Sequence, residues 1–161
     1  MTTFCKIQGG GWLEWLERRK GPLDLVVDSD TGNETDDQIA VAYALMNAER
    51  FRVHALVSAP FLHYRVLTAA EGEWCSHWEQ RRILSYFPKA ETRLWHGSQH
   101  FLTDAGGRLS PLPEGVEKLI DLSKGFSRDN PLFVVGIATL TNVAIALLAD
   151  ETLAEIGRAH V

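Results

Sequence analysis

Short apolar runs alternate with longer segments of helical periodicity along most of the chain. The apolar runs are rich in β-branched residues and bounded by turn residues, which is typical of buried strands. These predicted strands cover 23–27, 52–58, 93–96 and 132–137. The predicted helices cover 35–46, 71–87, 114–123 and 141–149, and a Gly- and Pro-containing loop covers 102–113. Strands that alternate with helices predict an α/β fold with an open, mostly parallel sheet and helices on both faces.

The two ends of the chain do not continue this alternation. We expect an N-terminal extension at 1–21 and one α/β domain at 22–154. Residues 155–161 show no periodicity, and we interpret them as a non-native tail that follows a domain truncated at its C-terminus. An open sheet that stops there is expected to keep an uncovered edge.

Composition and charge narrow the class of protein. The chain has 161 residues, 16 Lys and Arg against 21 Asp and Glu, and a formal net charge of −5. Nucleic-acid binding needs a basic face, so this balance argues against it. Cys5 and Cys75 are isolated and indicate neither a zinc site nor a disulfide framework. No apolar run is long enough for a membrane span or a signal peptide, so we expect a cytoplasmic protein without a membrane partner.

The strongest chemical signal follows the first predicted strand. The segment 28–38 reads Asp-Ser-Asp-Thr-Gly-Asn-Glu-Thr-Asp-Asp-Gln and carries five carboxylates. Ligands of open α/β sheets bind beyond the carboxyl ends of the strands, which is where this segment lies. Crowded carboxylates repel one another unless a cation lies among them, and oxygen ligands favour Ca²⁺ or Mg²⁺. The sequence therefore predicts a metal site in this segment.

A simpler explanation exists for part of the segment. Thr35 and Gln38 have the spacing of a capping box, and acidic residues such as Asp36 and Asp37 stabilise the first turn of any helix. Helix capping does not account for Asp28 and Asp30, because a strand that ends in Asp-x-Asp buries its first carboxylate near the sheet. Such burial is costly without a cation or hydrogen bonds. Asp28 and Asp30 therefore favour a metal site over an ordinary helix start.

Two segments resemble the inosine/uridine-preferring nucleoside hydrolase family. The first is Val26-Val27-Asp28-Ser29-Asp30 with Asp36-Asp37 at the start of an apolar helix, in a form similar to a divergent branch that reads Asn-Glu-x-Asp-Asp-Gln. The second is 134–144, where a strand leads through Thr-Leu-Thr-Asn into an alanine-rich helix. The resemblance covers about 22–150, the amino-terminal part of a family member, and implies a Rossmann-like sheet.

The resemblance implies calcium-dependent hydrolysis of the N-glycosidic bond of a ribonucleoside, which yields a free base and ribose. Asp30 is then a metal ligand and the general base that activates water, Asp37 the second carboxylate ligand, and Ile137 the backbone-carbonyl ligand. The resemblance also allows a homo-oligomer for the full-length family member. The family's late metal-binding aspartate has no counterpart up to Val161.

The resemblance assigns further residues around this centre. Asp36 is expected to face the ribose hydroxyls, with Asn33 and Glu34 as candidate sugar contacts. Asp28 is expected to orient the loop from behind the metal ligands. Asn142 is assigned to the same supporting position, and with Thr141 we expect it to cap the helix and hold its turn rather than act in catalysis.

Two alternatives stay open. Asp28-x-Asp30 also resembles the haloacid dehalogenase phosphatases, with Asp28 as nucleophile, Asp30 as acid/base and Mg²⁺ between them, although Gly32 departs from that family's pattern. The other alternative is an inactive fragment of a nucleoside hydrolase. Among the histidines, His54 lies inside a predicted strand and is expected to be a core or surface residue, and the sequence shows no recognisable partner for His63, His77, His96 and His100.

Overall fold

The computed structural model describes residues 19–103, 110–127 and 129–160, of which 155–160 are described by their backbone only. The predicted extension at 1–21 lies almost wholly outside this part of the chain. The described elements, in chain order, are β1 (Leu23–Ser29), α2 (Thr35–Met46), β2 (Phe51–Ser58), α3 (Ala69–Leu84), β3 (Arg93–Trp95), α4 (Glu114–Ser123), β4 (Leu132–Gly136), α5 (Thr141–Ala149), α6 (Leu153–Ile156) and β5 (Gly157–His160). None of the described helices has the length and apolar character needed to span a bilayer.

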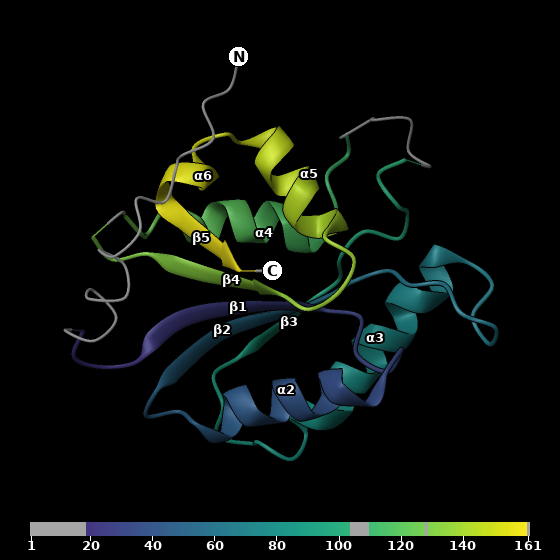
Figure 1. Ribbon diagram of the computed structural model, residues 1–161, viewed down its shortest axis with the longest axis horizontal. Helices are drawn as coiled ribbons and strands as arrows, with labels where there is room; N and C mark the ends of the chain where they lie inside the picture. The colour runs from purple at the N-terminus through teal and green to yellow at the C-terminus, as the bar shows by residue number, and fades with distance from the viewer. Residues whose placement is uncertain (1–18, 104–109, 128, 161) are drawn as a thin grey trace.

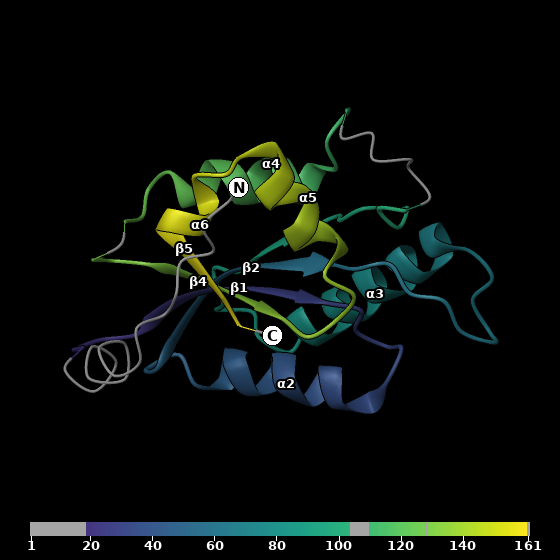
Figure 2. The same cartoon turned by 45° about the horizontal axis from the view of Figure 1, so that its top comes forward.

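The strands form a single parallel sheet in the order β3-β2-β1-β4-β5. Helices α2 and α3 cover one face, and α4, α5 and α6 cover the other (Figure 1). A view turned by 45° shows the same three layers with the sheet between the helices (Figure 2). The predicted α/β fold with an open, mostly parallel sheet is confirmed. The strand order reverses direction at β1, which makes the gap between β1 and β4 the topological switch point.

Alternate residues of β1 pack into two hydrophobic cores, one on each face of the sheet. Val26 packs with residues of α4 and α5 on one face, whereas Val27 packs with Val41 and Leu45 of α2 on the other. In the register, Val26 pairs with Ala55 of β2 and Val134 of β4. Because neighbours pair on both sides, β1 is the central strand, and its carboxyl end is held on both flanks.

The structure corrects several local predictions. The capping box at Thr35 and Gln38 is wrong, because the N-cap of α2 is Glu34 without a side-chain cap bond, and Gln38 bonds to Glu79 instead. A capping box does begin α3, where the Thr68 side chain accepts from the Glu71 backbone and the Glu71 side chain reaches back. Helix α3 therefore starts two residues before the predicted helix and ends at Leu84.

One prediction about packing is also wrong. Helix α2 is not buried all round, because Ile39, Tyr43 and Met46 are 66%, 56% and 73% exposed. An outer-layer helix turns one face to the sheet, and apolar residues beyond that face stay uncovered. No sequence pattern predicts a strand at 155–161, but the backbone of Gly157–His160 pairs in parallel with β4 as an edge strand; the interpretation of 155–161 as a non-native tail stays a prediction. That short segment lacks a strand pattern, so its pairing comes from tertiary context.

Candidate functional site

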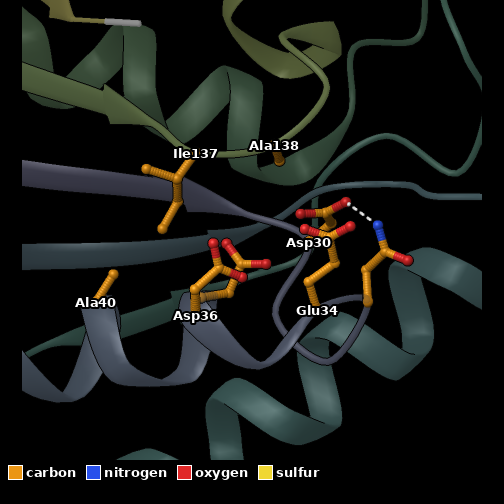
Figure 3. A pocket seen from close by; sticks show the side chains of 8 residues that line it. Asp30, Glu34, Asp36, Ala40, Ile137 and Ala138 are labelled. Atoms are coloured by element: carbon orange, nitrogen blue, oxygen red, sulfur yellow. Dashed lines mark hydrogen bonds between the residues drawn. The ribbon is translucent and has the colours of Figure 1, made fainter.

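A pocket lies at the switch point of the sheet, beyond the carboxyl ends of β1 and β4. Its volume is about 320 Å³. It is lined by Asp30, Asn33, Glu34, Asp36, Asp37, Ala40, Ile137 and Ala138. The first five come from the β1–α2 loop and the first turn of α2, and the last two follow β4, so three elements converge on one crevice (Figure 3). Ligands of such sheets bind at this position.

The loop that follows β1 turns sharply at Gly32. Its φ of 101° lies in the left-handed region, which suits glycine because it has no Cβ. The turn brings the Asn33 backbone N–H to the Asp30 carbonyl at 2.9 Å, and the Asn33 side-chain amide donates to Asp30 Oδ2 at 3.0 Å (Figure 3). The first bond closes the turn, and the second holds the Asp30 carboxylate at the pocket, where the residue is only 6% exposed.

Asp37 is held from the opposite side of the loop. The Ser29 hydroxyl donates to Asp37 Oδ1 at 3.2 Å and lies 2.6 Å from the Thr31 hydroxyl. The buried Gln80 of α3 donates to the Ser29 carbonyl and to the Thr31 hydroxyl. The carboxylate of Asp37 is therefore fixed through a polar network that reaches across to α3.

Asn142 joins the strand ends behind the pocket. Its side-chain amide donates to Asp28 Oδ1 at 2.8 Å and to the Ser58 carbonyl at 3.1 Å, and its Oδ1 accepts from the Ser98 backbone at 2.7 Å. One side chain thus ties together the ends of β1 and β2 and the segment after β3. The predicted helix cap is wrong, because the N-cap of α5 is Leu140 and no side chain caps that helix.

The carboxylates in and behind the pocket gain protons more readily than ordinary carboxylates when no cation is near. Burial raises the pKa of Asp28 to about 7, a bond from Asn142 opposes this, and the Asp30 charge raises it further. Burial, followed by the charge of Asp30, raises the pKa of Asp37 to about 6. The pKa of Asp30 is raised as well, again chiefly by burial. Mutual repulsion among buried carboxylates is what a bound cation relieves.

The donor set fits a hard cation such as Ca²⁺. The pocket offers carboxylate oxygens from Asp30 and Asp37, and Ile137 lies on its wall with its backbone N–H bound to the Asp28 carbonyl at 2.9 Å. Asp28 Oδ2 is buried without a hydrogen-bond partner in the structure. Buried polar atoms are rarely left in that state, and an ion or water among the carboxylates satisfies such oxygens.

The structure brings the predicted site residues together. Six of them line the pocket: Asp30, Asn33, Glu34, Asp36, Asp37 and Ile137. Asp28 and Asn142 lie behind it and are bonded to each other. Their roles stay predictions. Sequence reasoning missed Gln80 and Ser58, whose contacts to the loop and to Asn142 cross 51 and 84 positions of the chain. No local pattern marks such partners.

Comparison with known proteins supports the fold. No protein-family model matches the sequence, and no curated protein matches it. Among solved structures, a plant nucleoside hydrolase superimposes with a TM-score of 0.61 at 20% identity, over 84% of this chain and 46% of its own. A purine-preferring ribonucleoside hydrolase from Gardnerella vaginalis gives a TM-score of 0.58 at 21% identity, over 83% of this chain and 46% of its own.

An inosine-guanosine nucleoside hydrolase gives a TM-score of 0.56 at 21% identity, over 81% of this chain and 44% of that one. The chain therefore spans about half the length of these structures. At this identity the likeness establishes the fold, and it agrees with the resemblance seen in the sequence.

Proposed function

We propose that this chain carries the calcium-binding, catalytic half of a nucleoside hydrolase site and hydrolyses the N-glycosidic bond of ribonucleosides. The observation that carries the proposal is the pocket at the switch point, where Asp30 from the end of β1, Asp37 from the first turn of α2 and Ile137 from the end of β4 meet. The similarity of the fold to nucleoside hydrolases supports the same conclusion. The substrate is a small ribonucleoside, and the products are a free base and ribose.

The acidic loop, defined as residues 28–37, divides the work among its carboxylates. Asp30 and Asp37 would hold Ca²⁺ together with the Ile137 carbonyl, since all three residues line the pocket. When bound, the ion would supply positive charge that lowers the pKa of the attacking water and offers a coordination site to ribose hydroxyls. Asp30 accepts the proton of that water, and the Asn33 amide keeps its carboxylate turned to the pocket.

The remaining residues of the loop address the sugar. Asp36 lies on the first turn of α2, exposed toward the pocket, and accepts hydrogen bonds from ribose hydroxyls. Asn33 and Glu34 offer further polar contacts from the loop. Asp28 and Asn142 act as positioning residues, because their mutual bond fixes where the strand ends and the loop begins.

The phosphatase alternative has less support. In that mechanism Asp28 has to attack the substrate, yet Asp28 is 1% exposed, does not line the pocket and is bound by Asn142. A buried and hydrogen-bonded carboxylate cannot approach a phosphorus atom without rearrangement of three strand ends. The position of Asp28 therefore favours the nucleoside hydrolase mechanism over the phosphatase mechanism.

Ribose release from inosine, uridine and guanosine tests the proposal directly. We expect release with added Ca²⁺ and its loss after chelation with EGTA, recovered when Ca²⁺ is restored. Release that is unchanged by EGTA contradicts the calcium mechanism. No release from any of the three substrates, in protein that binds Ca²⁺, contradicts the enzymatic proposal and identifies the chain as an inactive binding fragment.

A further inference from the structure

A second group of ligating side chains lies outside the carboxylate pocket. Glu73 and His77 are one turn apart on α3, and His96 follows β3. Each offers one ligating atom, and the three atoms lie within 4.8 Å of one another. None of the three residues lines the pocket of the acidic loop. We call this group the histidine cluster, and we propose that it binds a divalent transition-metal ion of the Zn²⁺ type.

Glu73 is the first reason for the proposal. The residue is 0% exposed, and both of its hydrogen bonds go to one oxygen: Ser58 donates to Oε1, and His96 Nδ1 lies 2.9 Å from the same atom. Its second oxygen, Oε2, is buried without a partner. A buried carboxylate that leaves one oxygen unbonded is unusual, because each buried polar atom that forgoes water needs a replacement.

His77 is the second and independent reason. Its Nδ1 is buried and has no hydrogen-bond partner in the structure. Burial, together with the charges of His96 and Arg81, lowers the pKa of His77 to about 4. The imidazole is therefore neutral at physiological pH and keeps a lone pair for a metal. Two unpartnered buried atoms, one of them nitrogen and the other oxygen, thus lie in the same cluster.

The geometry of the two imidazoles shows what binding requires. Their rings stack with centroids 3.5 Å apart and an interplanar angle of 7°. Lone pairs lie in the ring planes, so parallel rings cannot both point at one ion, and one ring has to rotate. The His77 ring is the one that can rotate, because within the described residues only its ring contacts with Trp74 and His96, and no hydrogen bond, hold it in place. Binding replaces the stack with two metal–nitrogen bonds.

The donor set selects the ion. Two imidazoles and one carboxylate are the ligands that Zn²⁺ accepts, whereas Ca²⁺ takes oxygen ligands. Three protein ligands leave a fourth position of a tetrahedral ion open. His96 is 31% exposed on its side chain, which gives the ion a route from solvent, and the exposed Trp74 lies beside it with ring centroids 4.9 Å apart. The bound ion would clamp α3 to the end of β3.

Calorimetric titration of Zn²⁺ into metal-stripped protein, in the presence of excess Ca²⁺, tests this site. We expect one Zn²⁺ per chain. His77→Ala should weaken the affinity by about tenfold or more, since even groups that only support a ligand contribute that much. Glu73→Gln should do the same while keeping the volume of the side chain. Circular dichroism confirms that each variant is folded, and His77→Ala removes no hydrogen bond of the structure.

Two controls separate the cluster from other Zn²⁺ sites. His100→Ala removes an exposed histidine outside the cluster, and Asp30→Asn alters the acidic loop; both should bind Zn²⁺ as the unchanged protein does. Co²⁺ in place of Zn²⁺ should give visible absorption bands that His77→Ala abolishes. Absence of Zn²⁺ binding, or equal affinity in His77→Ala and the unchanged protein, overturns the proposal.

Discussion

The acidic loop and the histidine cluster are both groups of potential metal ligands, but they differ in where those ligands come from along the chain. The loop collects its carboxylates from ten consecutive positions, Asp28 to Asp37, at the end of β1. The cluster takes Glu73 and His77 from α3 and His96 from beyond β3, 23 positions away from Glu73. A contiguous site can be predicted from sequence, whereas a site assembled by tertiary packing needs the structure.

The two sites also differ in the ions that they suit. Oxygen-only donors favour Ca²⁺, and a mixed nitrogen and oxygen set favours Zn²⁺. They are joined by Ser58: its hydroxyl donates to Glu73, and its carbonyl accepts from Asn142, which also holds Asp28. Because one residue serves both sites, variants have to be chosen to disturb one and leave the other intact.

The largest expected effect concerns the acidic loop. Asp30→Asn should lower the rate of ribose release by about 10²–10⁴-fold, the contribution of a general base. The matched control is Asp121→Asn on α4, where the side chain is 73% exposed and paired with Lys124, and the rate there should not change. Steady-state kinetics with inosine measures both variants. An equal rate in Asp30→Asn and the unchanged protein removes Asp30 from the mechanism.

A smaller effect is expected where the two sites meet. Asn142→Ala removes two donors and one acceptor from buried partners and should lower the free energy of unfolding by about 3 kcal/mol. Asn47→Ala is the control, because its side chain makes one exposed bond to the Tyr43 carbonyl and should cost less than about 1 kcal/mol. Urea denaturation compares them. Equal losses contradict the joining role assigned to Asn142.

The smallest expected effect is a pH dependence of folding stability, which runs in opposite directions for Asp28 and His77. The folded-state pKa of Asp28 is raised from 3.8 to about 7, so its stabilisation is complete below 3.8 and is lost as the pH rises through about 7. The pKa of His77 is lowered from 6.5 to about 4, so its stabilisation is present above 6.5 and is lost as the pH falls through about 4.

In EGTA, the stability difference between the unchanged protein and Asp28→Asn should therefore fall by about 2 kcal/mol from about pH 5 to about pH 8. The difference for His77→Ala should rise with pH over the lower part of that range. Urea denaturation at several pH values measures both. If both stability differences change with pH in the same direction, the opposite pKa shifts assigned to Asp28 and His77 are refuted.

Particular residues show how far the sequence could predict this molecule. The strands and the loop at 28–37 follow from local patterns, because apolar runs and turn residues lie next to one another in the chain. The burial of α2 was mispredicted, since composition does not reveal which face meets the sheet, and Tyr43 is exposed. The strand at Gly157–His160 was missed because pairing with β4, rather than propensity, makes it a strand.

The central claim is that the acidic loop binds Ca²⁺ and ribose together, and one titration tests it. Ca²⁺ is titrated calorimetrically into metal-stripped protein with and without ribose, and the titration is repeated with Asp30→Asn and with His77→Ala. The account predicts that ribose tightens Ca²⁺ binding, that Asp30→Asn abolishes the binding, and that His77→Ala leaves it intact. An affinity for Ca²⁺ that changes neither with ribose nor in Asp30→Asn would contradict the account.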